Sequence, residues 1–294
     1  MRHLIILGLF LILGDPSARV QAGPMFLAVP QSAAELTAQA RDKEKAGDVD
    51  GAIADYTRAI TLDPKDAATY GLRGLAKKAK GDCPGAIADY SRALELDPKN
   101  ATAFFNRGSA RVDLRVYGEA IQDFTRAIEL DPRNSHLYHF RGCAFYDARF
   151  FGSAVTDFKK SIDLEAEGWE FPRLRLWLAR AKMGDRGEAT EDLKKYLARR
   201  TPPQGTDYLG KAAHFLTEEL TADAFIDSVE SDLTEGSRRW RCQAYFLLGE
   251  RSVLDGDKPS AARFFEKALA TKATAWRDYQ SAEVALDRLR TEKK

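Results

Sequence analysis

The sequence contains little cysteine, and its charges of opposite sign are almost equal in number. The chain has only three cysteines, Cys83, Cys143 and Cys242. Three cysteines can form at most one disulfide bond, so they do not make a disulfide framework. The 45 lysines and arginines nearly balance the 44 aspartates and glutamates, and no basic run is present. Because nucleic-acid binding depends on a basic surface, this balance argues against a nucleic-acid partner.

The sequence also lacks an apolar run long enough to cross a membrane near its start. The run LIILGLFLIL at 4–13 is short, whereas a membrane-spanning helix needs about 20 residues. It follows the positive start MRH and precedes Val20 and Ala22, a small-residue pattern typical of signal peptidase sites. We therefore interpret residues 1–22 as a signal peptide, and we expect an exported, periplasmic protein without a transmembrane segment after its removal. No lipobox cysteine follows the run, and an uncleaved amphiphilic anchor is the alternative interpretation.

What the sequence does contain is an internal repeat of constant length. Four segments align at one spacing: GDVDGAIADYTRAITLDPKD (47–66), GDCPGAIADYSRALELDPKN (81–100), RVYGEAIQDFTRAIELDPRN (115–134) and RFFGSAVTDFKKSIDLEAEG (149–168). A small residue and a bulky aromatic residue recur in phase, at Ala52, Ala86, Ala120 and Ala154 and at Tyr56, Tyr90, Phe124 and Phe158. Glycine recurs in the preceding helix at Gly74, Gly108 and Gly142. Small residues in these positions let two helices approach closely.

This pattern resembles the tetratricopeptide repeat (TPR), whose period is about 34 residues, and it covers 33–168 without a gap. The resemblance implies an all-α fold, a right-handed α-solenoid of antiparallel helix pairs. In such a solenoid the first helix of each pair lines a concave groove. Asp-Pro steps after the second helices are consistent with it, because proline cannot continue a helix.

The repeat weakens after residue 168 and returns near the C-terminus. We divide the chain into a tail at 23–32, repeats 1–4 at 33–168, a degenerate fifth repeat at 169–200, non-repeat helices at 201–241, a sixth repeat at 242–273, and a capping helix and tail at 274–294. The order of elements over about 173–290 is similar to that of the NlpI-type bacterial TPR proteins. Those are periplasm-facing dimeric adaptors that present cell-wall hydrolases to one another and to a protease. The resemblance implies a protein-binding adaptor and allows a homodimer, although this chain lacks that family's lipidated cysteine.

Charged residues also follow the period of the repeat, at positions where a buried apolar residue is usual. They are Arg73, Arg107, Arg141 and Arg175, together with Asp55, Asp89, Asp123 and Asp157. A buried arginine is tolerated when a carboxylate pairs with it. We predict a ladder in which each aspartate binds the arginine of the following repeat, as in Asp55 with Arg73, so that each repeat fixes the stacking register of the next. Pairing within one repeat, as in Arg73 with Asp89, and an anionic ligand held by the arginines are the alternatives.

The predicted concave groove is the candidate binding site. Its residues are Phe105, Asn106, Ser109, His136, His139, Cys143, Tyr146, Arg173 and Trp177. A groove that mixes aromatic and polar groups suits an extended or helical peptide. We therefore expect a protein or peptide client, bound by repeats two to five together with the surface between 201 and 241.

Other functions fit the sequence less well. His136, His139 and Cys143 are spaced i, i+3, i+7, at which imidazole and thiolate ligands bind zinc or copper, so a metal- or small-molecule-binding protein is the alternative function. No fourth ligand is apparent, and we expect no metal and no cofactor. Some TPR proteins bind the C-terminal carboxylate of a chaperone through a clamp of lysine and asparagine residues. Asn106 occupies one position of this clamp, but the neighbouring repeats lack the basic residues that it requires. No nucleophile elbow or phosphate loop is present, so we expect no enzyme.

Overall fold

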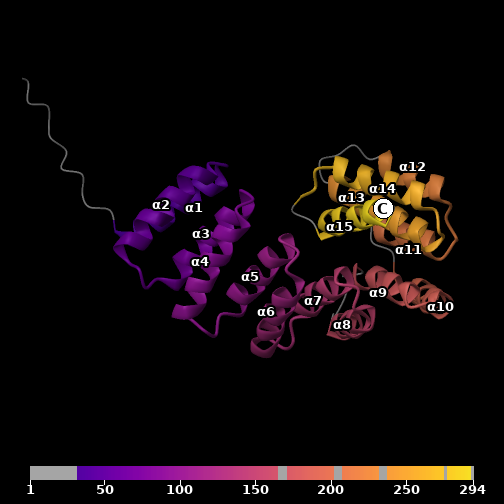
Figure 1. The fold of residues 1–294 in the computed structure, drawn as a ribbon, viewed down its shortest axis with the longest axis horizontal. Helices are drawn as coiled ribbons and strands as arrows, with labels where there is room; N and C mark the ends of the chain where they lie inside the picture. Colours follow the sequence, from indigo (N-terminus) through magenta and orange to yellow (C-terminus); the bar gives the residue numbers. More distant parts are fainter. Residues whose placement is uncertain (1–31, 165–170, 202–206, 232–236, 275–276, 293–294) are drawn as a thin grey trace, which may run out of the picture.

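The computed structural model describes residues 32–164, 171–201, 207–231, 237–274 and 277–292. The predicted signal peptide (1–22) and residues 23–31 of the predicted tail lie outside this part of the chain. The described residues form helices that pack as consecutive pairs (Figure 1), so the predicted all-α solenoid is confirmed. The pairs of the first four repeats are α1 (Ala33–Lys45) with α2 (Val49–Leu62), α3 (Ala67–Ala79) with α4 (Cys83–Leu96), α5 (Ala101–Asp113) with α6 (Tyr117–Leu130), and α7 (Ser135–Asp147) with α8 (Phe151–Leu164).

The remaining helices continue the solenoid for one pair and then turn back. They are α9 (Phe171–Lys182), α10 (Arg186–Leu197), α11 (Tyr208–Leu216), α12 (Ala222–Glu230), α13 (Ser237–Leu254), α14 (Lys258–Ala270) and α15 (Arg277–Thr291). Figure 1 shows α11–α15 as a cluster that faces α7–α10 rather than extending the row of helices. In the described part of the chain no helix has the length and apolarity needed to span a bilayer.

The repeated small and bulky residues form the core that the sequence predicts. The four small alanines of the second helices are completely buried, and the four aromatic rings are at most 1 % exposed. A Cβ atom on Gly142 would lie 2.8 Å from Phe158 Cε1, and one on Gly108 would lie 3.0 Å from Phe124 Cε1. Glycine therefore recurs because the ring of the second helix rests directly on the backbone of the first.

The turn between the two helices of a repeat usually contains a left-handed glycine, but in two repeats this glycine is replaced by arginine. Four turns place glycine in the left-handed backbone region, at Gly47, Gly81, Gly184 and Gly256. The equivalent residues in repeats 3 and 4 are Arg115 (φ 61°) and Arg149 (φ 68°). A non-glycine residue in this region costs about 1 kcal/mol. The following helix-capping aspartate is also replaced, by Val116 and Phe150, and both of these apolar side chains are exposed.

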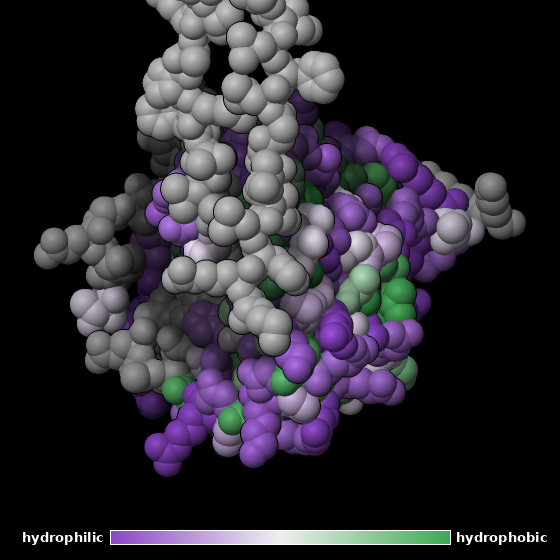
Figure 2. Space-filling model, turned by 90° about the vertical axis from the view of Figure 1, so that its left-hand side faces the viewer, coloured by the Kyte–Doolittle hydropathy of each residue, from purple (hydrophilic) through white to green (hydrophobic). Residues whose placement is uncertain are grey.

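The C-terminal helix contacts more than the sixth repeat. α15 packs on α13 and α14, and it also lies against α7, on the inner side of the solenoid (Figure 1). The largest buried core joins the two parts of the chain, since Trp177 and Leu178 of α9 belong to the same cluster as Phe246 and Phe265. The end of the molecule seen in Figure 2 is mainly hydrophilic, with only small hydrophobic patches.

Candidate functional site

The periodic arginines bind aspartates within their own repeat. Arg73 donates to Asp89 from Nε (2.9 Å) and Nη2 (2.7 Å). Arg107 binds Asp123 with the same two nitrogens, at 3.0 Å and 2.7 Å. Arg141 binds Asp157, with both distances at 2.8 Å. The predicted pairing of each aspartate with the arginine of the following repeat is therefore wrong, and the alternative pairing within one repeat is the one that forms.

The link to the preceding repeat is made by a hydroxyl group instead. The third guanidinium nitrogen, Nη1, donates to Thr57 Oγ1 from Arg73 (3.1 Å), to Ser91 Oγ from Arg107 (3.1 Å) and to Thr125 Oγ1 from Arg141 (3.0 Å). Each arginine thus joins its own first helix to two second helices. Sequence reasoning missed these hydroxyls, although they also recur once in each repeat, directly after the bulky aromatic site.

The ladder changes at both ends for identifiable reasons. Asp55 has Gln39 where the later repeats have arginine, so it lacks that partner. It keeps its pair with Lys43 (2.6 Å), whose counterpart Lys77 also binds Asp89 (2.8 Å). At the far end Lys159 replaces the hydroxyl residue, so that position no longer offers an acceptor to Arg175. Arg175 is buried and donates to Asp278 of α15 rather than to Asp157.

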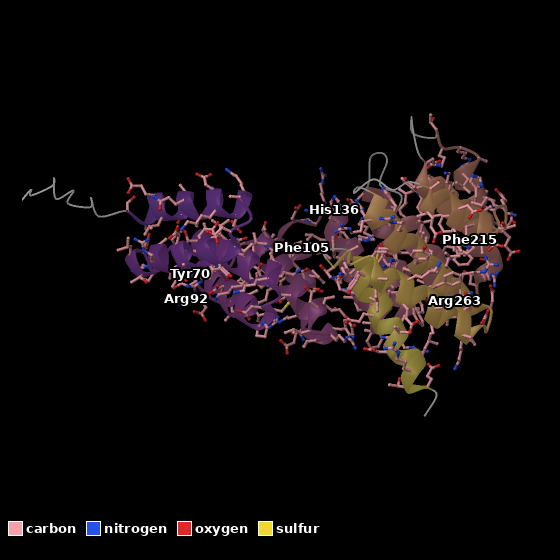
Figure 3. The ribbon with its side chains drawn as sticks, turned by 90° about the horizontal axis from the view of Figure 1, so that it is seen from above. Tyr70, Arg92, Phe105, His136, Phe215 and Arg263 are labelled. Carbon is pink, nitrogen blue, oxygen red and sulfur yellow. The ribbon has the colours of Figure 1, made fainter. Side chains whose placement is uncertain are left out.

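The concave groove is open at repeats 1 and 2 and closed at repeat 4. The exposure of the ninth residue of each first helix decreases from repeat 1 to repeat 4. Arg41 is exposed, Leu75 is 42 % exposed, Ser109 is half-buried and Cys143 is completely buried. Because these residues occupy equivalent positions, the difference reflects what covers the groove rather than the repeat itself. Figure 3 shows Phe105 and His136 midway along the molecule, where the N-terminal repeats give way to the C-terminal helices.

The element that closes the groove is α15. Asp147 at the end of α7 accepts hydrogen bonds from Arg277 and from Ser281 Oγ (3.3 Å), and its backbone carbonyl accepts one from Arg288. Arg115, in the turn after α5, donates to Asp287 at 2.6 Å. These contacts are mainly charged, and they hold α15 across the inner surface of repeats 3 and 4.

Four predicted groove residues are therefore buried. His139, Cys143 and Tyr146 lie on α7 beneath the C-terminal helices, and Tyr146 donates to Glu250 of α13 at 2.9 Å. Trp177 is 1 % exposed and donates to Thr190 Oγ1 of α10 at 3.0 Å. The prediction that these side chains face an open groove is wrong. The three residues of α7 are covered by helices that return from the C-terminal end of the chain, and Trp177 turns toward α10 of its own repeat. The other five are exposed or half-buried: Phe105, Asn106, Ser109, His136 and Arg173.

The predicted histidine and cysteine face is a packed interior rather than an open site. His139 Nε2 and Cys143 Sγ lie 3.6 Å apart, and the His139 ring packs against Phe158. Burial, helped by the nearby Arg175 charge, lowers the pKa of His139 well below its usual value. Within the residues described, no group of three or more His, Cys, Asp or Glu side chains is arranged to hold a metal ion. All three cysteines are free and buried.

The lowered pKa of His139 predicts a pH-dependent stability. Below the unfolded-state pKa of about 6.5, the unfolded chain takes up a proton that folded His139 does not, so stability falls as the pH drops. The contribution approaches a slope of about 1.4 kcal/mol per pH unit. We expect His139→Gln to remove this slope between pH 6.5 and 5.5 in denaturant titrations. His136→Gln, at an exposed position, should retain it, and equal slopes in both variants would contradict the assignment.

Family models match the repeats that define the groove. Models of the TPR repeat match residues 37–77, 74–114 and 101–134. The chain is a tetratricopeptide repeat protein. TPR proteins typically mediate protein–protein interactions. A comparison with curated proteins finds no match.

Solved structures of other TPR proteins are similar to this one. A crystal structure of the MamA protein is 26 % identical, with a TM-score of 0.54, over 56 % of this chain and 90 % of that chain. A TPR protein from Parabacteroides merdae is 19 % identical, with a TM-score of 0.58, over 87 % of this chain and 99 % of that one. The second likeness concerns the fold alone.

Proposed function

We propose that this TPR protein is a non-enzymatic adaptor of the bacterial cell envelope that binds a peptide segment of a protein client. The binding surface is the concave groove of repeats 1–3. The observation that carries the proposal is the exposure of this surface, where Leu75 remains 42 % exposed while its equivalent Cys143 is covered. Leu75 and Phe105 offer apolar contacts, and Asn106, Ser109 and Thr102 offer polar ones.

The packing of α15 supports a peptide as the occupant. The same surface, one repeat further along, holds α15: Asp147 accepts hydrogen bonds from Arg277 and Ser281, and Tyr146 belongs to the same buried cluster as Leu289. A surface built from equivalent helices is suited to a similar segment of another protein. Phe105 packs edge-on against Phe140, with ring centroids 5.0 Å apart, which gives the groove a rigid apolar floor.

The client class and the cellular location rest on the sequence. The apolar run at 4–13 favours export, and the resemblance to NlpI-type adaptors favours cell-wall hydrolases or a periplasmic protease as clients and a homodimer as the assembly. Mass spectrometry of the protein from its native host tests export, since a mature chain beginning at Gly23 is expected. An N-terminus that still carries residues 1–22 in a cytoplasmic fraction would contradict it.

A single substitution in the open groove tests client binding. We expect Leu75→Asp to weaken the client at least tenfold, about 1.4 kcal/mol, because a carboxylate replaces the apolar contact. The matched control is Leu62→Asp on α2, where the leucine is 56 % exposed and lies on a second helix outside the groove. The client is first captured from envelope extract by a photo-crosslinker at Thr102, and its affinity is then measured by calorimetry. Equal affinities for the two variants would place the binding surface elsewhere.

A further inference from the structure

A cavity lies where the two parts of the chain meet, outside the open groove. It has a volume of about 100 Å³ and is lined by residues of α7–α9 and α13–α15 and by adjoining turn and terminal residues. One wall is apolar, with Phe151, Val253 and Leu289. The cavity is smaller than the roughly 300–1,000 Å³ of sites for drug-sized ligands, so its occupant has to be a small group that offers both an apolar and a charged part.

The two charged side chains at the inner end of the cavity, Glu250 and Lys182, pair with each other. Glu250 is 4 % exposed, accepts a hydrogen bond from Tyr146 (2.9 Å) and pairs with Lys182 Nζ at 2.7 Å. Because the carboxylate and the ammonium group cancel, this end is polar but carries no net charge. It does not attract an ion of either sign.

The opposite edge of the cavity carries an excess of positive charge. Arg149, Lys258 and Arg288 line it together with one carboxylate, Glu292. Lys258 pairs with Glu292 at 2.9 Å, and Arg288 donates to the carbonyl of Asp147. The three cations lower the pKa of Glu292, with Lys258 the largest contributor. In the part of the chain that the structure covers, the Arg149 guanidinium has no hydrogen-bond or ion-pair partner.

Arg149 has a left-handed backbone conformation that is unfavourable for arginine, which suggests that its side chain has a role. Four other repeats have glycine at the same left-handed position, and arginine there costs about 1 kcal/mol. The other exception, Arg115, pairs with Asp287 at 2.6 Å and with Glu283 at 3.5 Å, so that its charge secures α15. Arg149 has no such pair among the described residues, although it lines a cavity that has room for a ligand. Strain at a position of this kind points to a functional role for the side chain.

We propose that the cavity binds a small organic anion in which a carboxylate is joined to a short apolar chain. The carboxylate pairs with Arg149 at the positive edge, and the apolar chain packs against Phe151, Val253 and Leu289. Such a group occurs in a free carboxylic acid and at the C-terminus of a peptide that ends in an apolar residue. The inference is independent of client binding in the concave groove.

The test measures binding of matched probes to the full chain by calorimetry. Hexanoate represents the free acid, and N-acetyl-Ala-Ala-Leu represents a peptide C-terminus. Hexanol and the amide of the same tripeptide are the uncharged controls. We expect at least one anion to bind at least tenfold more tightly than its uncharged control. The stronger of the two anions identifies the source of the carboxylate, and no preference for either anion would overturn the proposal.

Variants at two left-handed residues separate binding from folding. Arg149→Gly restores the residue found at this position in four other repeats, so we expect a melting temperature equal to or above that of the wild type together with at least tenfold weaker binding. Lys272→Gly makes the same backbone change at another left-handed residue (φ 54°), which does not line the cavity, and should leave the affinity unchanged. Equal loss of affinity in both variants, or no loss in Arg149→Gly, would overturn the role given to Arg149.

Discussion

Replacing Asp147 by alanine is expected to lower the free energy of unfolding by about 3–5 kcal/mol, the usual effect of leaving a buried charge without its partner. Asp147 is 2 % exposed, and its carboxylate accepts hydrogen bonds from Arg277 and Ser281. The substitution leaves the largely buried guanidinium of Arg277 unpaired, so α15 should detach before the rest of the chain unfolds. Denaturant titration measures the first effect, and amide hydrogen exchange over 277–291 measures the second.

The control for this prediction is the equivalent residue one repeat earlier. The Asp113 side chain is 19 % exposed and pairs with Lys78 at 2.9 Å. Both side chains of this pair remain partly exposed, so the Lys78 charge can be hydrated once Asp113 is removed. Asp113→Ala should therefore have a small effect on stability and none on exchange in α15. A similar loss in both variants would show that α15 is not held through Asp147.

Replacing Gly249 by alanine is expected to destabilise the protein by about 3 kcal/mol, at the upper end of overpacking costs. A Cβ atom at this position would lie 2.4 Å from Cε1 of Phe265, whose ring is completely buried. The ring has no free space to move into, so either it or the backbone of α13 must shift. The change is measured by chemical denaturation.

The matched variant, Gly71→Ala, should have the opposite sign. Gly71 lies in the middle of α3, and a Cβ atom there would have no neighbour within 4 Å. Alanine is favoured over glycine in a helix by about 0.5–1 kcal/mol, so stability should rise by that amount. Destabilisation by both variants would show that glycine is required for a reason other than the close aromatic contact, since alanine at Gly71 would meet no neighbour.

The repeats were predictable because the residues that define them lie close together in the sequence and recur at the same spacing in several repeats. Gly108, Ala120 and Phe124 lie close together in the sequence, and each has counterparts at the same position of other repeats, so packing geometry follows from spacing alone. The charged ladder was predicted only in part. Arg73, Arg107 and Arg141 each have one aspartate before them and another after them at almost equal separations, and only the orientation of the side chains decides which of the two is bound.

The closed half of the groove was not predictable from the repeat. Tyr146 and Cys143 occupy positions that face the groove in the earlier repeats, and nothing near them in the sequence indicates that they are covered. Their burial depends on Glu250, Asp278 and Arg277, which lie far along the chain in the C-terminal helices. One local sign was available, since Arg115 and Arg149 stand where the other repeats have glycine.

The hydroxyl residues of the ladder determine where the solenoid can change in length. A duplicated copy of the second or third repeat would find a hydroxyl before it and supply one after it, because Thr57, Ser91 and Thr125 are interchangeable acceptors. A copy placed after the fourth repeat would set its arginine against Lys159, where two positive charges would meet. Whole repeats can therefore be added among the N-terminal repeats only, and Lys159 marks the position after which a further repeat would no longer fit the ladder.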